Sequence, residues 1–510
     1  MTARKGARTR GILASVGLAA VASLAFAGVA AAAVGPDQPG HPDSGTLIIN
    51  KYKGNYTATP SDDDLLDGVE FIVQRVGKLD GTTCKPIDLT TPGGWELVKD
   101  FIPAGENEIH TAAPADPYCL VGTAITQETE DGTAEFKDLP LGLYFVKEGA
   151  DNGNNNIVDP VQPFYVTIPL AVKGGTAEAP TYTWEYDVVV NPKNATSEAP
   201  NKQVTDPQPE GQWVLGSQVE WTITNTIPLL NEGSFTEISV TDPLDERLSY
   251  VKESTEFTVG DIVLSLSTDG VNGDYTLGTV DPNTLVWTLT ESGLKKAFTQ
   301  QGKELKVVFK TTIESLTPNG VVPNKATVSF NNKPQDTPEP ITFWGGFKFL
   351  KVDESNSGKT LAGAEFAVIE KGAGDCPATL PEDAVIRGTA TSNAAGVVTF
   401  PGLWISNWNP PAGDDNPQVK TRDYCLYETK APAGYEIPAG TFPKVVTVEA
   451  EAPDGTVDIG SVKNPQVKPP TLPQTGANGT LLMTIGGIAI VAAGLGAALV
   501  ARNRRQSQDA

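Results

Sequence analysis

The residues with the clearest chemical meaning lie near the C-terminus, at Leu472, Pro473, Gln474, Thr475 and Gly476. Proline fixes its own φ and disfavours helix at the residue before it, so this stretch should be extended and accessible. Residues 481–500 are uncharged, mostly apolar and long enough to cross a bilayer, and the tail ARNRRQSQDA adds positive charge behind them. The sequence therefore predicts an accessible peptide bond, Thr475–Gly476, held at a membrane surface.

The pentapeptide, the apolar span and the basic tail together resemble the cell-wall sorting signal of Gram-positive surface proteins. The resemblance implies that the cysteine thiolate of a sortase attacks the Thr475 carbonyl, releases residues 476–510 and holds the remainder as an acyl-enzyme. A peptidoglycan amine would convert that acyl-enzyme into a single wall-anchored protein. A lysine from another copy would convert it into a polymer.

Lys193 is the candidate for that lysine. It lies in TWEYDVVVNPKN, residues 183–194, which resembles the pilin motif WxxxVxVYPK with Asn191 in place of the usual tyrosine. The matching positions are Trp184, Val188, Val190, Pro192 and Lys193. An ordinary last strand ending in a solvated lysine is the alternative. A nucleophilic lysine must react as the free amine, so a pKa lowered by desolvation or by a cationic neighbour would help.

A second motif, YCLYETKAPAGYE at 424–436, resembles the E-box of CnaB-like domains. In those domains a glutamate catalyses an intramolecular isopeptide bond between a lysine and an asparagine. The resemblance assigns these roles to Glu428, Lys351 and Asn464. Lys351 shares its period-2 face with Phe347 and Phe349, which favours an inward side chain, although Lys348 is a competitor. Burial favours a neutral amine and a protonated carboxyl, and the carboxyl can polarise the asparagine amide for attack.

Two further sets of residues suggest the same chemistry. The segment 197–340 resembles a pilin isopeptide domain that uses aspartate, with matching positions at Lys202, Asp242 and Asn324. A β-sandwich with an Asp-Pro turn and a terminal asparagine is the alternative there. Nearer the N-terminus, Lys51, Glu148 and Asn194 could form a third set, but the ETxAP half of the E-box is missing after Glu148. We expect no bond at that set, or one that forms late.

The elements that must position these residues are strands. Alternating stretches such as VEWTITNTI and LKVVFKTTI are separated by Gly, Pro, Asn and Asp clusters, and LDGVEFIV at 66–73 is echoed by LAGAEFAV at 361–368. The sequence predicts an all-β protein of three tandem Ig-like or CnaB-like β-sandwich domains. The expected divisions are a signal peptide at 1–33, an N-terminal domain at 45–193, a middle domain at 197–340, a C-terminal domain at 341–466, a linker with LPQT at 467–475 and the sorting signal at 476–510.

Composition and cysteine usage indicate an exported protein. Residues 1–33 have a basic start, an apolar stretch and an Ala-rich end, which predicts a cleaved signal peptide, with an uncleaved anchor as the alternative. We expect Cys84 to pair with Cys119 and Cys376 with Cys425, because each pair lies within one predicted domain. The cysteines lack metal-ligand spacing and the chain has only 2 histidines, so no metal site is expected. The net charge of −24 disfavours nucleic-acid binding.

Together these features resemble the SpaA-type backbone pilin of sortase-assembled fimbriae, with CnaB-like outer domains. The resemblance implies a shaft subunit of a covalently polymerised, wall-anchored pilus that supports adhesion. The implied partners are pilin-specific and housekeeping sortases, other copies of the chain, accessory tip and base pilins, and peptidoglycan. The implied location is the cell wall of a Gram-positive bacterium, after transient membrane anchoring. A monomeric wall-anchored adhesin is the alternative.

An enzymatic role other than autocatalytic isopeptide formation is not expected. The sequence has no nucleophile elbow, no HExxH motif and no Gly-rich phosphate loop. The acidic stretch SDDDLLD at 61–67 could hold a calcium ion, but solvated turns with several aspartates are commoner. We therefore expect no cofactor.

Overall fold

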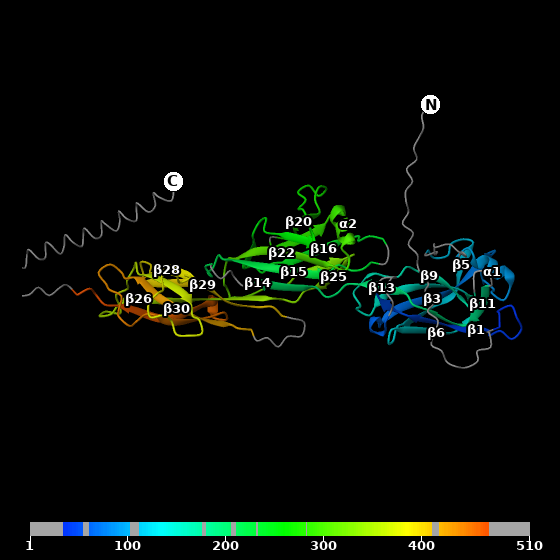
Figure 1. Cartoon of the computed structure of the whole chain (residues 1–510), viewed down its shortest axis with the longest axis horizontal. Helices are drawn as coiled ribbons and strands as arrows, with labels where there is room; N and C mark the ends of the chain where they lie inside the picture. The colour runs from blue at the N-terminus through cyan, green and yellow to red at the C-terminus, as the bar shows by residue number, and fades with distance from the viewer. Residues whose placement is uncertain are drawn as a thin grey trace, which may run out of the picture.

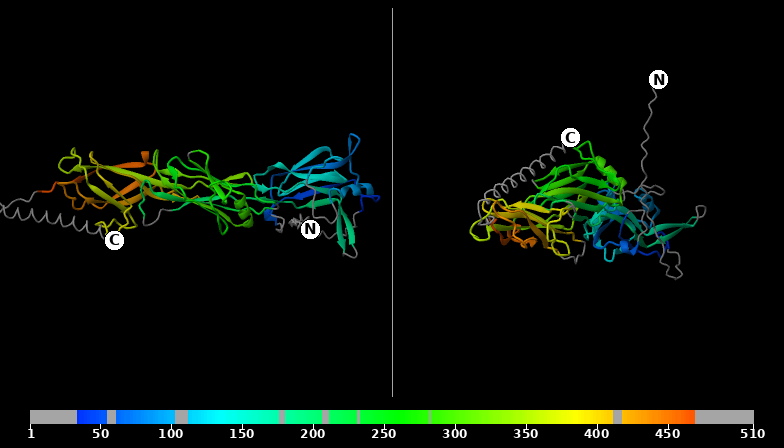
Figure 2. Two further views of the ribbon diagram at one scale, coloured as in Figure 1. Left: turned by 90° about the horizontal axis from the view of Figure 1, so that it is seen from above. Right: turned by 60° about the vertical axis from the view of Figure 1, so that its left-hand side comes forward.

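The computed structural model describes residues 34–54, 61–102, 112–175, 180–205, 211–230, 233–281, 283–410 and 418–468. Within these ranges the chain forms three β-sandwich bodies arranged end to end (Figures 1 and 2). The first body is blue and cyan, the middle one green, and the last one yellow to orange. The predicted all-β class is confirmed.

The first body is built from short strands around two hydrophobic clusters. Its elements are β1 (Ser44–Asn50), β2 (Tyr52–Lys53), η1 (Asp62–Asp64), β3 (Val69–Asp80), β4 (Thr83–Pro86), α1 (Pro92–Val98), β5 (Tyr118–Glu128), β6 (Thr133–Pro140), β7 (Gly142–Asn152), β8 (Ile157–Asp159), β9 (Phe164–Ile168), β10 (Leu170–Gly175), β11 (Pro180–Glu185), β12 (Asp187–Val190) and β13 (Lys193–Thr196). The main sheet has the order β4-β3-β7-β9, with β5 also on β3. The last strands β12 and β13 run parallel to the first strands β1 and β2, so the two ends of this body are neighbours.

The middle body packs two sheets face to face. Its elements are β14 (Asn201–Thr205), β15 (Gln218–Thr226), β16 (Ile238–Pro243), β17 (Leu248–Tyr250), β18 (Glu256–Val259), β19 (Ile262–Val263), β20 (Tyr275–Thr279), β21 (Thr284–Leu289), α2 (Glu291–Thr299), β22 (Glu304–Ile313), β23 (Val321–Pro323), β24 (Thr327–Phe330) and β25 (Lys333–Asp336). One sheet has the order β14-β15-β22-β18-β19 and the other β20-β21-β16-β24-β25. Strands such as β22 alternate buried and part-exposed residues, as expected of a sheet with one face in the core.

The last body repeats the parallel pairing of first and last strands. Its elements are β26 (Ile341–Asp353), β27 (Glu365–Glu370), β28 (Gly388–Thr391), β29 (Val397–Trp408), β30 (Thr421–Lys430), β31 (Lys444–Glu449), η2 (Pro453–Gly455) and β32 (Thr456–Asn464). The first strand β26 lies between β29 and the last strand β32, and β32 runs parallel to β26. The opposite sheet has the order β28-β27-β30-β31.

The two joints between the bodies differ. At the second joint, Trp213 of the middle body exchanges backbone hydrogen bonds with Arg387 and Trp404 of the last body, and β23 pairs with β26. One continuous hydrophobic core runs through both bodies. At the first joint, the side chain of Asn331 donates to the Val158 carbonyl at 3.0 Å, and the Ser197 amide donates to the Asn156 carbonyl. The last body is therefore fused to the middle one more extensively than the first body is.

The predicted signal peptide, the LPQTG stretch and the apolar span all lie outside the described residues. In the part of the chain that the structure describes, no helix has the length and apolar character needed to cross a membrane.

Candidate covalent-linkage sites

The last body brings Lys351, Glu428 and Asn464 into one buried cluster. Lys351 Nζ lies 3.0 Å from Glu428 Oε2 and also donates to Asn464 Oδ1. Asn464 Nδ2 donates to Glu428 Oε1 at 2.6 Å. The side chains of Lys351 and Glu428 are both 0% exposed, whereas Lys348 points to solvent. These contacts bring the amine against the amide that it would attack, with the carboxyl touching both.

Burial sets the protonation preferences of this cluster. Loss of solvent lowers the pKa of Lys351 and raises that of Glu428, and the attraction between the two groups opposes both shifts only in part. The aromatic rings of Phe366 and Phe442 flank the amine, at 5.5 and 6.0 Å from Nζ to the ring centroids. Both shifts favour the neutral amine and the protonated carboxyl that amide attack requires.

The first body contains the same cluster, made from Lys51, Glu148 and Asn194. Lys51 Nζ lies 2.5 Å from Glu148 Oε1 and 2.5 Å from Asn194 Oδ1, and Asn194 Nδ2 donates to Glu148 Oε2 at 2.9 Å. Desolvation lowers the pKa of Lys51 to about 8, against the opposing effect of Glu148. Although the ETxAP segment is missing, the side chains of Lys51, Glu148 and Asn194 are in contact. Whether the bond forms there remains a prediction, and this geometry gives no reason for its absence.

The first cluster has one contact that the last one lacks among the described hydrogen bonds. The backbone N–H of Val161 donates to Asn194 Oδ1 at 2.6 Å. A backbone donor on the carbonyl oxygen of an amide stabilises the negative charge that develops there during attack.

The two clusters occupy equivalent backbone positions in the repeated segments. Glu148 is paired across the sheet with Phe71 of LDGVEFIV, and Glu428 is paired with Phe366 of LAGAEFAV. The amides of Lys51 and Lys351 donate to Gly132 and Gly396 respectively. The sequence had named Lys51, Glu148 and Asn194 as a possible third set, and this shared pairing supports grouping them although the E-box motif there is incomplete.

The middle body uses aspartate in place of glutamate. Lys202 Nζ lies 2.6 Å from Asp242 Oδ2, and both side chains are 0% exposed. Desolvation lowers the pKa of Lys202 to about 8 and raises that of Asp242, and the charge of Lys202 partly opposes the rise at Asp242. Asn324 is buried beside them, and neither its Oδ1 nor its Nδ2 has a hydrogen-bond partner. Burying an amide without hydrogen-bond partners costs free energy of folding. That cost would not remain if the amide were consumed in an isopeptide bond.

Lys193, the candidate intersubunit lysine, lies at the start of β13, directly before Asn194. It is 7% exposed, so it is not the solvated lysine of the alternative interpretation. Desolvation lowers its pKa, and the negative charge of Asp64 partly opposes the shift. Desolvation thus gives Lys193 the lowered pKa expected for a nucleophile. The charged group that acts on its amine is the carboxylate of Asp64, not a cation.

The predicted disulfides are confirmed. Cys84 and Cys119 are bonded, and so are Cys376 and Cys425. The first joins β4 to β5, and the second ties the segment after β27 to the E-box strand β30. The acidic stretch at 61–67 forms the short turn η1, in which Asp64 accepts hydrogen bonds from Ser61. Among the described residues, His, Cys, Asp and Glu side chains form no group of three that could hold a metal ion.

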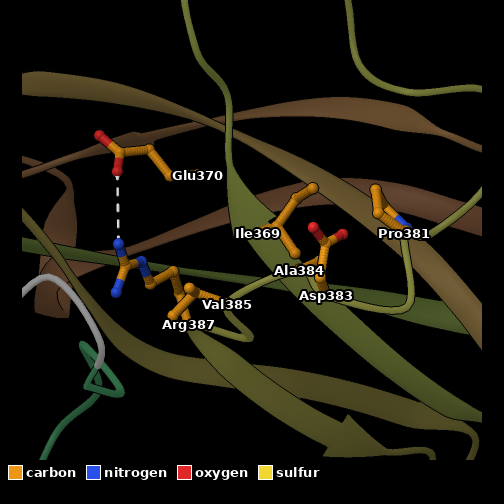
Figure 3. Close-up of a pocket in the computed structure, with 7 residues that line it drawn as sticks. All are labelled: Ile369, Glu370, Pro381, Asp383, Ala384, Val385 and Arg387. Carbon is orange, nitrogen blue, oxygen red and sulfur yellow. Dashed lines mark ion pairs between the residues drawn. The ribbon is translucent and has the colours of Figure 1, made fainter.

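A cavity of about 280 Å³ lies on the last body, away from the three clusters (Figure 3). Two of its three charged lining residues, Glu370 and Arg387, form an ion pair at 3.6 Å, and the third is Asp383. The Arg387 guanidinium also stacks on the Trp213 ring, 3.5 Å from the ring centroid. The guanidinium of Arg387 therefore contacts the joint between the middle and last bodies as well as the cavity.

Comparisons with known proteins agree with this organisation. Residues 38–195 match the N-terminal domain D1 of Gram-positive pilin subunits, residues 345–463 a prealbumin-like fold domain of the SpaA type, and residues 464–507 the LPXTG cell wall anchor motif. The chain is 31% identical to fimbrial subunit type 2 of Actinomyces naeslundii, with 91% of each chain covered. It is 28% identical to fimbrial subunit type 1 of Actinomyces viscosus over 96% of each chain. The full-length major pilin SpaD of Corynebacterium diphtheriae is 26% identical, with a TM-score of 0.57 over 84% of this chain and 98% of that one.

Tandem β-sandwiches followed by a wall-anchor motif define a structural surface protein of a Gram-positive cell wall. The similarity to a fimbrial subunit over 91% of the chain shows which family of such surface proteins it is. The chain belongs to the family of Gram-positive fimbrial subunits and major pilins. It is accordingly a secreted, cell-wall-anchored subunit of a surface fimbrium.

Proposed function

We propose that this chain is the shaft subunit of a covalent fimbrium, in which a sortase joins Thr475 of one copy to Lys193 of the next. The observation that carries the proposal is the state of Lys193. It is a desolvated lysine with a lowered pKa, and it lies outside the three clusters that use Lys51, Lys202 and Lys351. Other copies, pilin-specific and housekeeping sortases, accessory tip and base pilins, and peptidoglycan are the partners that this role requires.

The joining step exchanges one amide for another. The sortase thiolate breaks the Thr475–Gly476 peptide bond, the thioester retains the Thr475 acyl group, and residues from Gly476 onward leave with a free amine. The neutral amine of Lys193 then attacks the thioester carbonyl, an isopeptide bond forms, and the thiolate is released. Desolvation of Lys193 raises the fraction of amine available for this attack.

We further propose that each of the three bodies is stiffened by an internal isopeptide bond, with the first body extended beyond the predicted 45–193 to include Asn194 on β13, and the others at 197–340 and 341–466. The amine of Lys51, Lys202 or Lys351 attacks the side-chain amide of Asn194, Asn324 or Asn464, and ammonia leaves. Glu148, Asp242 and Glu428 act as the catalytic acids that polarise the amide. In the two outer bodies the bond ties the first strand to the last, so tension along a fibre that supports adhesion is carried by covalent bonds.

The test is an immunoblot of wall extracts boiled in detergent, from cells that express the native chain or Lys193→Ala. We expect a high-mass ladder from the native chain and monomer from the variant. Lys53→Ala is the matched control, because Lys53 lies on the neighbouring strand β2 and its side chain is half exposed. It should preserve the ladder. Monomer from the native chain as well would overturn the polymer and favour a singly anchored adhesin.

A further inference from the structure

Asp353 is a buried carboxylate with an unusually complete set of partners. Its Oδ2 accepts from the Tyr435 hydroxyl and from Gln466 Nε2, both at 2.8 Å. Its Oδ1 accepts from the Ser355 amide and hydroxyl, at 2.8 and 2.6 Å. The residue is 1% exposed, and its hydrogen bonds hold its pKa well below the usual range. Asp353 is therefore an ionised acceptor at the centre of a polar cluster.

The segments joined by this carboxylate are those that carry the reacting groups of the last body. Asp353 is two residues beyond Lys351 on β26, and Gln466 is two residues beyond Asn464 at the end of β32. Tyr435 closes the E-box segment that begins on the strand of Glu428. Asp353 is paired with Asn464 across the parallel strands, and Tyr435 is bridged to Gln466. We name Asp353, Tyr435 and Gln466 the latch.

From this geometry we infer that Asp353 is a positioning residue, which through Tyr435 and Gln466 holds the end of β32 in register so that the Asn464 amide meets Lys351. This inference rests on the proposed isopeptide bond. Asp353 does not contact the reacting atoms. It lowers the number of alignments that the three segments can sample before the Lys351 amine attacks, the new C–N bond forms and ammonia leaves.

The first body provides a natural contrast, because the hydrogen bonds described around its cluster include no such latch. The position equivalent to Asp353, two residues beyond Lys51, is Lys53. The side chain of Lys53 is half exposed and lies 3.7 Å from Asp64 on η1. The latch is therefore a property of the last body, and disrupting it should leave the linkage in the first body unchanged.

The experiment compares chains spanning residues 34–475, which contain all three bodies, as wild type, Asp353→Ala and Asp353→Asn. Freshly purified and incubated samples are digested, and mass spectrometry measures the fraction in which the Lys351 and Asn464 peptides are linked. We expect complete linkage in the wild type. In Asp353→Ala linkage should be slower by about tenfold, because charged hydrogen bonds that restrict alignment are lost. Asp353→Asn retains a polar group that can bond to Tyr435 and Gln466, and should recover much of the rate.

Three controls separate positioning from general damage. The Lys51–Asn194 linked peptide, measured in the same digests, should be unaffected. Asp274→Asn changes another buried aspartate, which accepts from Ser265, Ser292 and Lys296 in the middle body, and should leave the linkage at Lys351 complete. Thermal unfolding in a Lys351→Ala background, where no bond can form, shows whether Asp353→Ala still folds. If it does not fold, Tyr435→Phe provides the milder disruption.

The outcomes distinguish the latch from the bond itself. Slow linkage in folded Asp353→Ala, with recovery in Asp353→Asn, supports the inference. Linkage as fast and complete as in the wild type, in folded Asp353→Ala or in the substitute Tyr435→Phe, overturns it. A wild-type chain without the Lys351–Asn464 peptide would instead refute the proposed isopeptide bond.

Discussion

The first and last bodies hold the same three reacting groups in different surroundings. Both bury a lysine against a glutamate and an asparagine, on strands in equivalent register. The last body surrounds its cluster with the E-box segment and the latch. The first body has Lys53 in place of the latch aspartate, and a Val161 N–H on the asparagine carbonyl. The comparison shows that a lysine, a glutamate and an asparagine come into contact in both bodies, with the complete E-box segment in the last body and without its ETxAP half in the first.

The two bodies also differ in their attachment to the middle one. The last body shares a continuous core and the Trp213 crossing with it, whereas the described contacts at the first joint are few hydrogen bonds and the packing of Val158 and Ala195. Lys193, the proposed intersubunit lysine, lies on β13 near the less fused joint. The middle and last bodies are thus joined by more described contacts than the first and middle bodies.

The largest effect should follow from Glu428→Gln in the last body. Without the catalytic acid the bond does not form, and the chain keeps the mass of one additional ammonia. The linkage closes a loop between residues 113 apart, so its loss should cost about 5 kcal/mol of unfolding free energy. Intact mass and denaturant unfolding measure the two effects. A variant mass that shows no retained ammonia would remove Glu428 from the catalytic role.

Glu148→Gln should have nearly the same effect in the first body, and this prediction tests the comparison most sharply. The loop there spans residues 143 apart, so the expected loss is again about 5 kcal/mol. One retained ammonia in the intact mass would show that the bond forms without the ETxAP segment. A wild-type mass that shows only two lost ammonias, with none retained in Glu148→Gln, would show that the first body carries no bond, despite contacts that match those of the last.

Trp213→Ala tests the difference between the joints. Removing this buried indole leaves a cavity between the middle and last bodies and removes the stacking with Arg387, so we expect a loss of about 4 kcal/mol. Asn331→Ala, at the first joint, removes the hydrogen bond to the Val158 carbonyl and two that Asn331 accepts from Thr236 within the middle body, and should cost about 2 kcal/mol. Denaturant unfolding of the two variants gives both values. Equal losses would mean that the joints are equally fused.

The last effect expected is a pH dependence of the unfolding free energy, which depends on whether Lys51 is bonded. In Asn194→Ala the amine stays free, and its folded pKa of about 8 lies below the ordinary 10.5. The folded state then binds fewer protons than the unfolded state between pH 8 and 10.5, so stability rises with pH across that window, by about 3 kcal/mol. The rise should vanish in the Asn194→Ala, Lys51→Met double variant and in the bonded wild type. A wild type that shows the same rise would mean that Lys51 is unbonded.

The sequence predicted the features that local patterns encode. Strand alternation gave the fold class, and cysteine placement within domains gave both disulfides. The E-box resemblance led to Glu428, which the structure brings to Lys351 and Asn464 as proposed. For the first cluster, whose motif is incomplete, the sequence predicted no bond or a late one, and this stays a prediction. The structure brings its three groups together in the same register around Phe71 as around Phe366.

Other features depend on contacts between distant segments, which no local pattern reveals. Asp353 meets Tyr435 and Gln466 only after β26, the E-box segment and β32 have come together. The burial of Lys193 follows from the packing around β13, and its motif is equally compatible with a solvated strand end. Trp213 exchanges backbone hydrogen bonds with Arg387 and Trp404, which are far from it in the sequence.

The most direct test of the account is mass spectrometry of digested fimbriae released from the cell wall. The account predicts a branched peptide in which the carboxyl of Thr475 is joined to Nζ of Lys193. Lys51, Lys202 and Lys351 should appear in the same digest linked to Asn194, Asn324 and Asn464. Finding Thr475 joined only to peptidoglycan, with Lys193 unmodified in every peptide, would contradict covalent polymerisation through this lysine.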